Sequence, residues 1–245
     1  MSKDRFDVSV IVPCFNEEGN IPILVKKIQE CFTNHSINGE IILVNDASRD
    51  GTQEQIDMVR ERYKNIRSFT HEVNKGIYQS WLTGANSASG RYIVIIDADM
   101  QYDPSDIYSL YSEMQKNESD IIQCWRMNYY DSRLRRILNL GFSKFLNIIF
   151  NCRLKDIKSG FLICKKGVFI DMLSYKLKYK FPQHYITISA ISKGYTIKQI
   201  PTTFNKRFSG RSFISNPFVF SLGAMLELPK AFYEFRILRN RKGNN

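Results

Sequence analysis

The first half of the chain alternates short apolar runs with longer amphipathic segments, and this alternation restricts the fold more than any other feature. The apolar runs that predict strands cover 8–15, 40–46, 66–72 and 91–99. Segments with apolar residues every three or four positions predict helices within 16–32, 48–63 and 77–88, and from Pro104 onward. Strands that alternate with helices are typical of βαβ units. The sequence therefore predicts an α/β fold with a mostly parallel central sheet.

Polar side chains collect where these strands end. Three of the strands end in pairs of polar residues: Asn16 and Glu17, Asn45 and Asp46, and Asp97 and Asp99. The carboxyl ends of parallel strands lie at one edge of a sheet, and open α/β sheets bind ligands in the crevice beyond that edge. We therefore expect one binding site formed by the loops that follow the strands.

Asp97 and Asp99 require a cation. They stand one alanine apart after the apolar run 93–96, and carboxylates this close repel each other. Neither a glycine-rich dinucleotide loop nor a P-loop follows the first strand, so a bound nucleotide needs another counter-charge for its phosphates. Mg²⁺ and Mn²⁺ prefer oxygen ligands, and Mg²⁺ is usually held by one or two carboxylates plus substrate phosphates. The pair predicts an Mg²⁺ or Mn²⁺ site, with a solvated turn as the alternative.

Charge is divided unevenly along the chain, whose net charge is +11. Residues 1–124 carry 12 Lys/Arg and 19 Asp/Glu, a balance of −7, whereas residues 125–245 carry 23 Lys/Arg and 5 Asp/Glu, a balance of +18. This asymmetry predicts a basic face that meets phosphates, nucleic acid or a membrane surface. A basic surface that only keeps the protein soluble is the alternative.

The cysteines and the N-terminus indicate a cytosolic protein. The 5 cysteines are scattered and form no C-x-x-C pair, which favours reduced thiols over disulfides or a zinc site. The N-terminal stretch lacks the pattern of a signal peptide, so we expect none.

Four segments together carry a resemblance to a known family. They are VSVIVPCFNEEGNI, EIILVNDASRDGT, NKGIYQSWLTGANSASGRYIVIIDADMQYDP and DIKSGF. In this order they resemble family 2 glycosyltransferases of the GT-A fold, and more closely the polyprenyl-phosphate (dolichol-phosphate-type) hexose synthases. The match runs over about 7–212. It implies a Rossmann-like, mostly parallel sheet flanked by helices in a domain of residues 1–212. Residues 213–245 are expected to form a basic, amphipathic appendage at the membrane surface.

The resemblance implies roles for residues of the acidic half. Pro13, Phe15 and Glu17 would line the pocket of the nucleobase. Asp46 would hydrogen-bond the base, and Asp97 would lie beside the nucleotide. The metal would be held by three side chains, which are Asp97, Asp99 and Gln101. Packing at a strand end is the alternative for Pro13 and Phe15, and a turn is the alternative for Asp46.

The resemblance also implies an acceptor site and two further catalytic residues. Arg126, Arg135 and Arg136 fall where such enzymes place cations for the acceptor phosphate. Asp156 matches an aspartate near the reacting centre, and Arg207 matches an arginine of a mobile segment that closes over the donor. Asp156 could instead cap a turn, and the arginines could be solvated. Adjacent arginines on a helix cannot both face one ligand.

The implied activity is the transfer of a hexose from a UDP- or GDP-sugar to a polyprenyl phosphate, with inversion of the anomeric centre. A phosphate monoester is already an anionic nucleophile, so it needs cations more than a general base. A family 2 enzyme that glycosylates a glycan hydroxyl is an alternative, because His184 and Tyr185 stand where many relatives have a glutamate. A basic nucleic-acid-binding module is less favoured, since the second half lacks any recognised reader motif.

A lipid acceptor requires a place at the membrane. The apolar stretches around 137–150 and 213–226 are interrupted by polar residues, and neither approaches the roughly 18 apolar residues of a transmembrane helix. We expect both to form helices that lie on anionic lipid at the cytoplasmic face. A helix buried in the core or in a dimer is the alternative, so self-association is left open.

Overall fold

The computed structural model describes residues 6–116, 118–127, 133–179, 185–210, 223 and 225–238. For 133–140 and 142 it describes the backbone alone.

Seven strands of the described residues form one sheet in the order β3-β2-β1-β4-β6-β5-β7. Their bounds are β1 Phe6–Cys14, β2 Gly39–Asn45, β3 Ile66–Thr70, β4 Gly90–Ile95, β5 Ile121–Arg126, β6 Leu162–Lys165 and β7 Ile197–Thr202. β6 runs antiparallel to both of its neighbours, β4 and β5, and every other pair is parallel. The predicted α/β fold with a mostly parallel sheet is confirmed.

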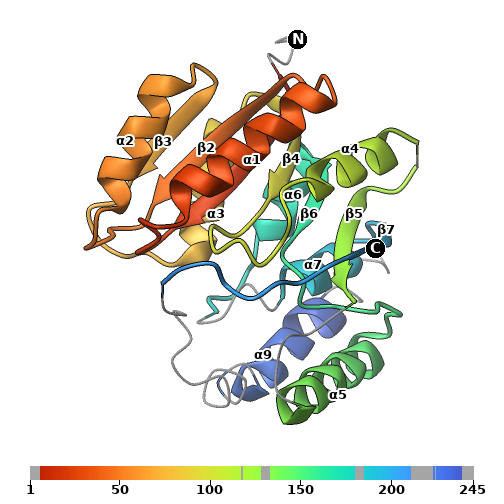
Figure 1. Cartoon of the computed structure of the whole chain (residues 1–245). Helices are drawn as coiled ribbons and strands as arrows, with labels where there is room; N and C mark the ends of the chain where they lie inside the picture. The colour runs from red at the N-terminus through yellow and green to blue at the C-terminus, as the bar shows by residue number, and fades with distance from the viewer. Residues whose placement is uncertain are drawn as a thin grey trace.

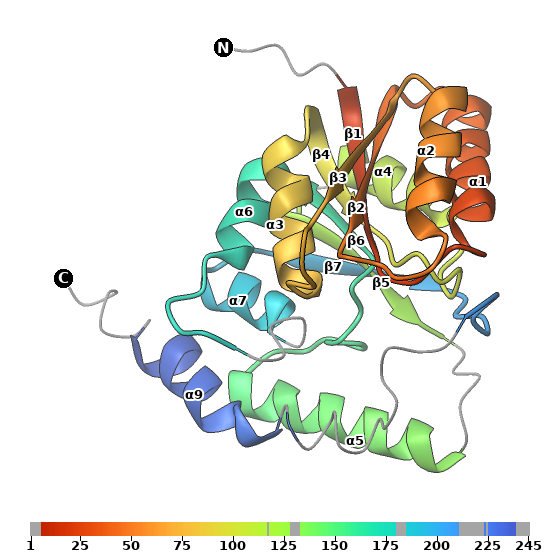
Figure 2. The same ribbon diagram turned by 90° about the vertical axis from the view of Figure 1, so that its left-hand side faces the viewer.

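Helices cover both faces of the sheet. Their bounds are α1 Ile21–Asn34, α2 Thr52–Arg62, α3 Ile77–Ser87, α4 Asp106–Lys116, α5 Arg133–Phe150, α6 Lys166–Leu173, α7 Ile186–Ser192 and α9 Leu228–Phe232, with a π-helical turn, η2, at Tyr233–Leu238. α1, α2 and α4 lie on one face, and α3, α6 and α7 lie on the other (Figures 1 and 2). In both views α5 and α9 lie apart from these layers, on the side toward which the parallel strands run.

The buried residues of β1 show how the strands supply both layers. Val8, Val10 and Val12 are fully buried under α1, whereas Ile11 is fully buried on the opposite face. Successive side chains of a strand point to opposite faces, so a continuous apolar run is what a strand covered on both sides requires. Each such side chain contributes about 1.5–3 kcal/mol when it is removed from water.

Gly84 brings α3 unusually close to the sheet. A Cβ built on this glycine would lie 2.4 Å from Cγ2 of Ile11, a distance that real side chains do not tolerate. The helix can therefore rest on β1 only because residue 84 has no side chain.

A third apolar cluster joins α5, α7, α9 and η2. Its buried members are Leu146, Phe150, Ile157, Tyr185, Ile188, Leu228, Ala231 and Phe235. The described C-terminal residues therefore share a core with residues that precede 212. The predicted boundary between 212 and 213 itself lies outside the described residues.

Two predicted strands end earlier than expected. β3 stops at Thr70, before the polar His71 and Glu72, and β4 stops at Ile95, although the apolar run continues through Ile96. The amide of Ile96 still donates to the carbonyl of Ile11 at 3.2 Å. Beyond that point the chain turns, so Asp97 and Asp99 lie in the loop after β4 rather than in the strand.

Candidate active site

The loops that follow β1, β2 and β4 share a backbone feature. Each contains one non-glycine residue with positive φ: Asn16 at 56°, Ala47 at 58° and Met100 at 64°. Residues other than glycine rarely adopt a positive φ, because it strains the backbone. Such strained residues are common at functional sites, where the backbone must have a fixed shape. Three such turns at this edge of the sheet therefore indicate a functional site.

Asn16 also ties the first two loops together. Its amide donates to Ser48 Oγ at 3.0 Å, and its Oδ1 accepts from the amide of Arg49 at 2.8 Å. Turns that are bonded to each other in this way present a preformed edge to a ligand.

Three carboxylates and one guanidinium meet at this edge. Arg207 Nη1 donates to Glu17 Oε1 at 2.8 Å, and Nη2 donates to Asp99 Oδ2 at 2.9 Å. Asp97 lies close enough for its pKa to be raised by Asp99 and lowered by Arg207. Among the described residues, the cation between the strand-end acids is therefore Arg207.

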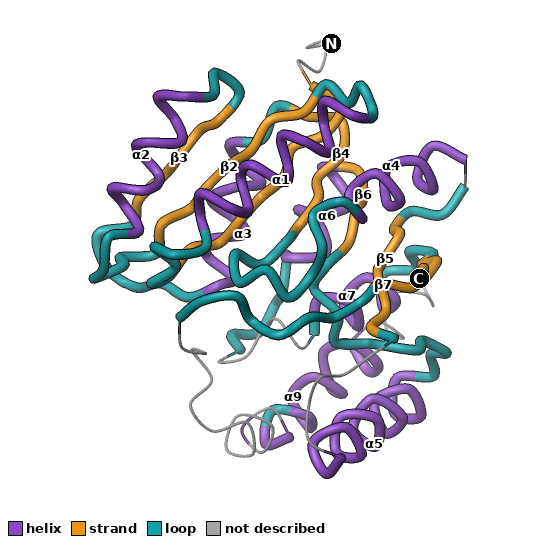
Figure 3. Tube along the Cα trace, viewed as in Figure 1, coloured by secondary structure: helices purple, strands orange, loops and turns teal. Residues whose placement is uncertain are grey.

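Arg207 reaches the acids on a segment that follows β7, here called the strap (203–210). The amide of Asn205 donates to the Gln101 carbonyl at 2.8 Å, and that of Phe208 donates to the Asp99 carbonyl at 3.2 Å. The strap crosses from the β7 side toward the loops after β1 and is all loop (Figures 1 and 3). It therefore lies over the edge that holds the acids.

Burial makes the ionised forms of these acids costly. Burial and the Asp99 carboxylate raise the pKa of Asp97 to about 7. Burial also raises the pKa of Asp99 and of Glu17, and Arg207 offsets this only in part. Perturbed carboxylates grouped at a strand edge are typical of functional sites.

The residues at this edge fit a divalent metal bound together with a phosphate. Within the described chain, no group of three or more His, Cys, Asp or Glu residues could hold a metal ion. Two carboxylates completed by phosphate oxygens, however, are a usual Mg²⁺ set. The Asp97 carboxylate makes no hydrogen bond with any described residue, which leaves its oxygens available as ligands.

Asp46 already has several protein partners. Its Oδ1 accepts from the amide of Lys75 at 2.8 Å and lies 2.7 Å from His71 Nδ1, while Oδ2 accepts from the amide of Gly76 at 2.7 Å. The carboxylate therefore fixes the loop before α3. Its predicted contact with a nucleobase stays a prediction.

Asp156 and Arg126, which were predicted separately, form one ion pair. Arg126 Nε donates to Asp156 Oδ2 at 2.6 Å and Nη2 donates to Oδ1 at 3.0 Å, and the aspartate is 1% exposed. Burial alone would raise the pKa of Asp156, but Arg126 and backbone amides hold it below its usual value. A carboxylate held ionised in this way is a weak base.

The other predicted residues take different places. Pro13 is half-buried near the end of β1, and Phe15, also half-buried, directly follows the strand. Gln101 lies in the loop after β4, and its side-chain amide donates to the Asn205 carbonyl at 3.4 Å. Arg135 and Arg136 belong to α5, but their side chains, like all of His184, lie outside the described residues.

Sequence reasoning missed His71, Thr83 and Asn20. His71 bridges Asp46 to Thr83, whose Oγ1 lies 2.9 Å from Nε2. Asn20 Nδ2 donates to Glu17 Oε2 at 2.5 Å. A histidine near the end of the predicted strand 66–72 was the available signal for the first contact. An asparagine before a helix is ordinary, so the sequence held no signal for the second.

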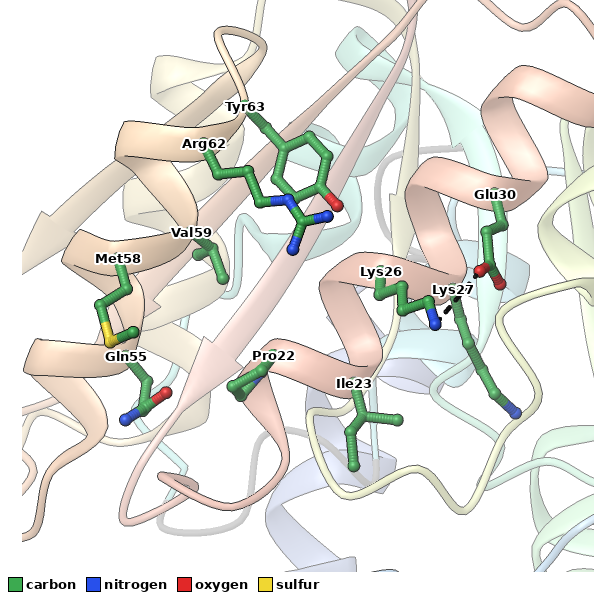
Figure 4. A pocket seen from close by; sticks show the side chains of 10 residues that line it. All are labelled: Pro22, Ile23, Lys26, Lys27, Glu30, Gln55, Met58, Val59, Arg62 and Tyr63. Atoms are coloured by element: carbon green, nitrogen blue, oxygen red, sulfur yellow. Dashed lines mark ion pairs between the residues drawn. The ribbon is translucent and has the colours of Figure 1, made fainter.

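The hollow in Figure 4 is a separate feature. It is a groove of about 430 Å³ between α1 and α2, lined by Pro22, Ile23, Lys26, Lys27, Glu30, Gln55, Met58, Val59, Arg62 and Tyr63. Its lining includes none of the strand-end acids, so the groove does not belong to the site.

No helix of the described residues is both long enough and apolar enough to cross a bilayer. α5 and the C-terminal helices nevertheless expose large apolar side chains, which are Phe145, Ile148, Met225, Leu226, Phe232, Tyr233 and Ile237.

Comparison with known families and sequences gave one family match and several relatives. A model of glycosyl transferase family 2 matches residues 9–173. Dodecaprenyl-phosphate galacturonate synthase of Rhizobium johnstonii is 32% identical over 152 residues, which are 61% of this chain and 45% of that protein. Dolichol-phosphate mannosyltransferase of Pyrococcus furiosus is 28% identical over 227 residues, or 87% of this chain and 60% of that one. The chain spans about half the length of the curated relatives it matches.

Solved structures show the same fold. The crystal structure of glucosyl-3-phosphoglycerate synthase from Mycobacterium tuberculosis with Mn²⁺, uridine diphosphate and glucosyl-3-phosphoglycerate aligns with a TM-score of 0.67. The alignment covers 94% of this chain and 80% of that one, at 17% sequence identity. The predicted GT-A fold is therefore confirmed.

Proposed function

Because the chain belongs to glycosyl transferase family 2, we propose that it moves a hexose from a UDP- or GDP-sugar to a polyprenyl phosphate, with inversion of the anomeric centre. The observation that carries this proposal is the group of Asp97, Asp99, Glu17 and Arg207 at the carboxyl edge of the sheet. Two relatives are named for polyprenyl-type phosphate acceptors, which supports this choice of acceptor.

The donor would bind at the strand-end acids. Asp97, Asp99 and Gln101 would hold Mg²⁺ or Mn²⁺, which supplies Lewis-acid stabilisation of the charge that develops on the leaving diphosphate. The half-buried Pro13 and Phe15 would line the nucleobase pocket, with Asp46 near the base. Arg207 adds a positive charge at the same carboxylates, and a guanidinium suits diphosphate oxygens because its fork donates two parallel hydrogen bonds.

The acceptor would be held by charge rather than activated by a base. Asp156 keeps a low pKa through Arg126, so it suits the positioning of a cation better than proton removal. Arg126, which is 15% exposed in its side chain, would face the acceptor phosphate with Asp156 behind it. Arg135 and Arg136 remain proposed partners of the same phosphate.

One observation favours a second candidate, transfer to a glycan hydroxyl. A hydroxyl acceptor needs a general base whose pKa lies near the working pH. Without a bound metal, burial and Asp99 raise the pKa of Asp97 to about 7, so Asp97 would be the base of a transfer to a hydroxyl that needs no metal.

The enzyme would work on the cytoplasmic face of the membrane, where its product would feed the synthesis of cell-envelope glycans. The exposed apolar side chains of α5 and of residues 225–238 support a peripheral attachment. Cations of the basic half would add attraction to anionic lipid.

Substitution of Asp99 tests the metal and the donor site. We expect Asp99→Asn to abolish transfer at an unchanged far-UV circular dichroism spectrum, because it removes a charged ligand from a loop and not core volume. Asp103→Asn is the matched control, since Asp103 only caps the following turn through the Ser105 amide. Wild-type activity that survives EDTA would contradict the proposal that transfer needs a divalent metal.

A panel of labelled sugars tests the acceptor. Purified protein is given UDP- and GDP-hexoses with Mn²⁺ and polyprenyl phosphate, and the labelled product is partitioned between organic solvent and water. Label in the organic phase supports the lipid acceptor. Label that requires an added glycan and stays in water supports the second candidate.

A further inference from the structure

Asn20 departs from the usual behaviour of its position. It immediately precedes α1, where an asparagine normally accepts a hydrogen bond from a backbone amide of the first turn. Its side chain makes no such cap bond. The residue is 1% exposed, and its Oδ1 has no partner among the described residues. A buried acceptor without a partner costs stability, so the side chain must serve another contact.

That contact is a bridge between the turn after β1 and the strap. Asn20 Nδ2 donates to Glu17 Oε2 at 2.5 Å and to the carbonyl of Ser209 at 3.2 Å. The other oxygen of Glu17 accepts from Arg207, two residues before Ser209. Glu17, Asn20, Ser209 and Arg207 therefore close a ring of contacts between the two segments.

The turn is shaped to receive the strap. A Cβ on Gly19 would lie 2.7 Å from Ser209 Oγ, so a side chain at residue 19 would push Ser209 away. Gly210 has a φ of +81°, and a Cβ there would lie 3.8 Å from the carbonyl oxygen of Asn16. The missing Cβ of Gly19 and the positive φ of Gly210 therefore let the strap lie directly on the turn, within reach of the Asn20 side-chain amide.

We propose that Asn20 is a positioning residue of the transfer reaction: its side-chain amide holds the strap, and with it the guanidinium of Arg207, against the strand-end carboxylates. This inference rests on the proposed function. Asn20 acts through Glu17 and Ser209, whereas Arg207 is the group that touches the donor site.

Two variants separate positioning from helix capping. Serine is as favourable as asparagine at the start of a helix, so Asn20→Ser keeps a residue that suits this position, while its short hydroxyl cannot span Glu17 and Ser209. Asn65→Ala is the matched control. Asn65 Nδ2 also bridges two acceptors, the Gly39 carbonyl at 2.8 Å and Gln29 Oε1 at 3.3 Å, but Asn65 makes no contact with the strap.

The measurements are hydrogen exchange of the strap and steady-state kinetics. The amides of Asn205 and Phe208 donate to carbonyls of the loop after β4, so their exchange reports whether the strap is held. In Asn20→Ser we expect strap peptides to exchange about tenfold faster. We also expect kcat/KM for the donor to fall about tenfold, with the KM for the acceptor unchanged. Asn65→Ala should change neither, and Asn20→Gln, which keeps an amide, should recover part of both.

Wild-type exchange and kinetics in Asn20→Ser would overturn the inference, because the residue would then only begin the helix. Equal losses in Asn20→Ser and Asn65→Ala would overturn it too, since both would reflect general destabilisation. If the wild-type protein transfers no hexose from any UDP- or GDP-sugar, the proposed function fails. The exchange comparison still decides whether Asn20 holds the strap.

Discussion

Asp97, Asp99 and Glu17 share Arg207, so in their ionised forms the three carboxylates carry more negative charge than one guanidinium balances. Burial adds to the cost, because each ionised carboxylate has lost part of its water shell. A protein that keeps such a group must gain its stability elsewhere, and the proposed divalent metal would supply the positive charge that the group lacks.

The pH dependence of stability should show this cost at Asp97. Its pKa is raised from the ordinary value of an aspartate to about 7, so the folded protein is penalised as pH rises from about 4 through 7. In EDTA without nucleotide, Asp97→Asn should raise Tm over wild type at pH 7.5 and raise it by clearly less at pH 5, where only the first part of the penalty is present. The scale is about 2–4 °C per kcal/mol for a chain of this size. Differential scanning calorimetry at both pH values measures it.

Asp57→Asn serves as the control, because Asp57 forms only an exposed pair with Arg60 on α2. Its effect on Tm should be small at both pH values. A gain in Asp97→Asn that is the same at pH 5 and pH 7.5 would show that Asp97 is not the titrating group.

Loss of the Arg126–Asp156 pair should lower the free energy of unfolding and not only weaken binding of the proposed acceptor. Removing one partner leaves a buried charge without compensation, so Arg126→Ala should lower the free energy of unfolding by about 3–5 kcal/mol in urea. Arg126→Met together with Asp156→Leu should cost less than the sum of the single changes. Arg60→Ala, at an exposed pair, should cost under about 1 kcal/mol. If Arg126→Ala unfolds at the wild-type urea concentration, the ion pair does not stabilise the fold, and a rise in the KM for polyprenyl phosphate alone would leave Arg126 only its proposed role at the acceptor.

The positions of single residues could be predicted from the sequence where the ends of strands determine which side chains lie together. Asp97, Asp99 and Glu17 lie together because parallel strands end at one edge, and a pattern of strands predicts that. The pairing of Arg126 with Asp156 depends on how the chain returns after α5, over 30 residues. Local spacing carries no information about such a return, so their union could not be predicted.

At the scale of elements, β1 to β4, the helices α1 to α4 and the helix around 137–150 could be predicted, whereas β5, β6 and β7 could not. β1, β2 and β4 are apolar on both faces, and their signal is therefore strong. β6 has 4 residues, and it enters the sheet between β4 and β5 in the opposite direction. A strand so short, inserted between the two strands that precede it in the sequence, has too little pattern to be recognised.

One methyl group added between α3 and β1 should lower the stability of the folded protein. Gly84→Ala forces a Cβ against Ile11, so overpacking should destabilise the protein by about 1–3 kcal/mol. Gly167→Ala, on α6, meets nothing within 4 Å and should be neutral or stabilising by about 0.5–1 kcal/mol, since alanine favours a helix. Urea denaturation of both variants measures the difference. A gain in stability for both would mean that α3 moves away from the sheet at no cost.

At the scale of the whole molecule, the acidic half supplies the carboxylates of the strand-end site, and the basic half carries most of the large apolar side chains that the described residues expose. Ile148 on α5 is 71% exposed and Leu226 is 76% exposed, in the part of the molecule that lies beyond the strand ends. A bilayer facing these helices would place its anionic head groups near the edge where the acceptor phosphate is expected.

Charge placed on this surface should weaken membrane binding. Ile148→Glu combined with Leu226→Glu should reduce sedimentation with phosphatidylserine vesicles at least about tenfold, because each lost apolar contact is worth about 1.5–3 kcal/mol. Met58→Glu, at a residue that is 62% exposed on α2, should have no effect. High salt should weaken wild-type binding, since the lipid charge is screened. A wild-type protein that never sediments with such vesicles at low salt would refute the attachment.

Arg207 is a counter-ion that the chain itself supplies to Glu17 and Asp99. The proposed metal and donor would therefore have to replace its guanidinium at these carboxylates. A bare divalent ion would have to compete with a cation that is tethered to the chain and present at high local concentration. A metal that arrives with a diphosphate offers the displaced guanidinium a new anion, so the competition becomes a swap. Metal and nucleotide would then strengthen each other's binding by the same factor, and each alone would bind only weakly.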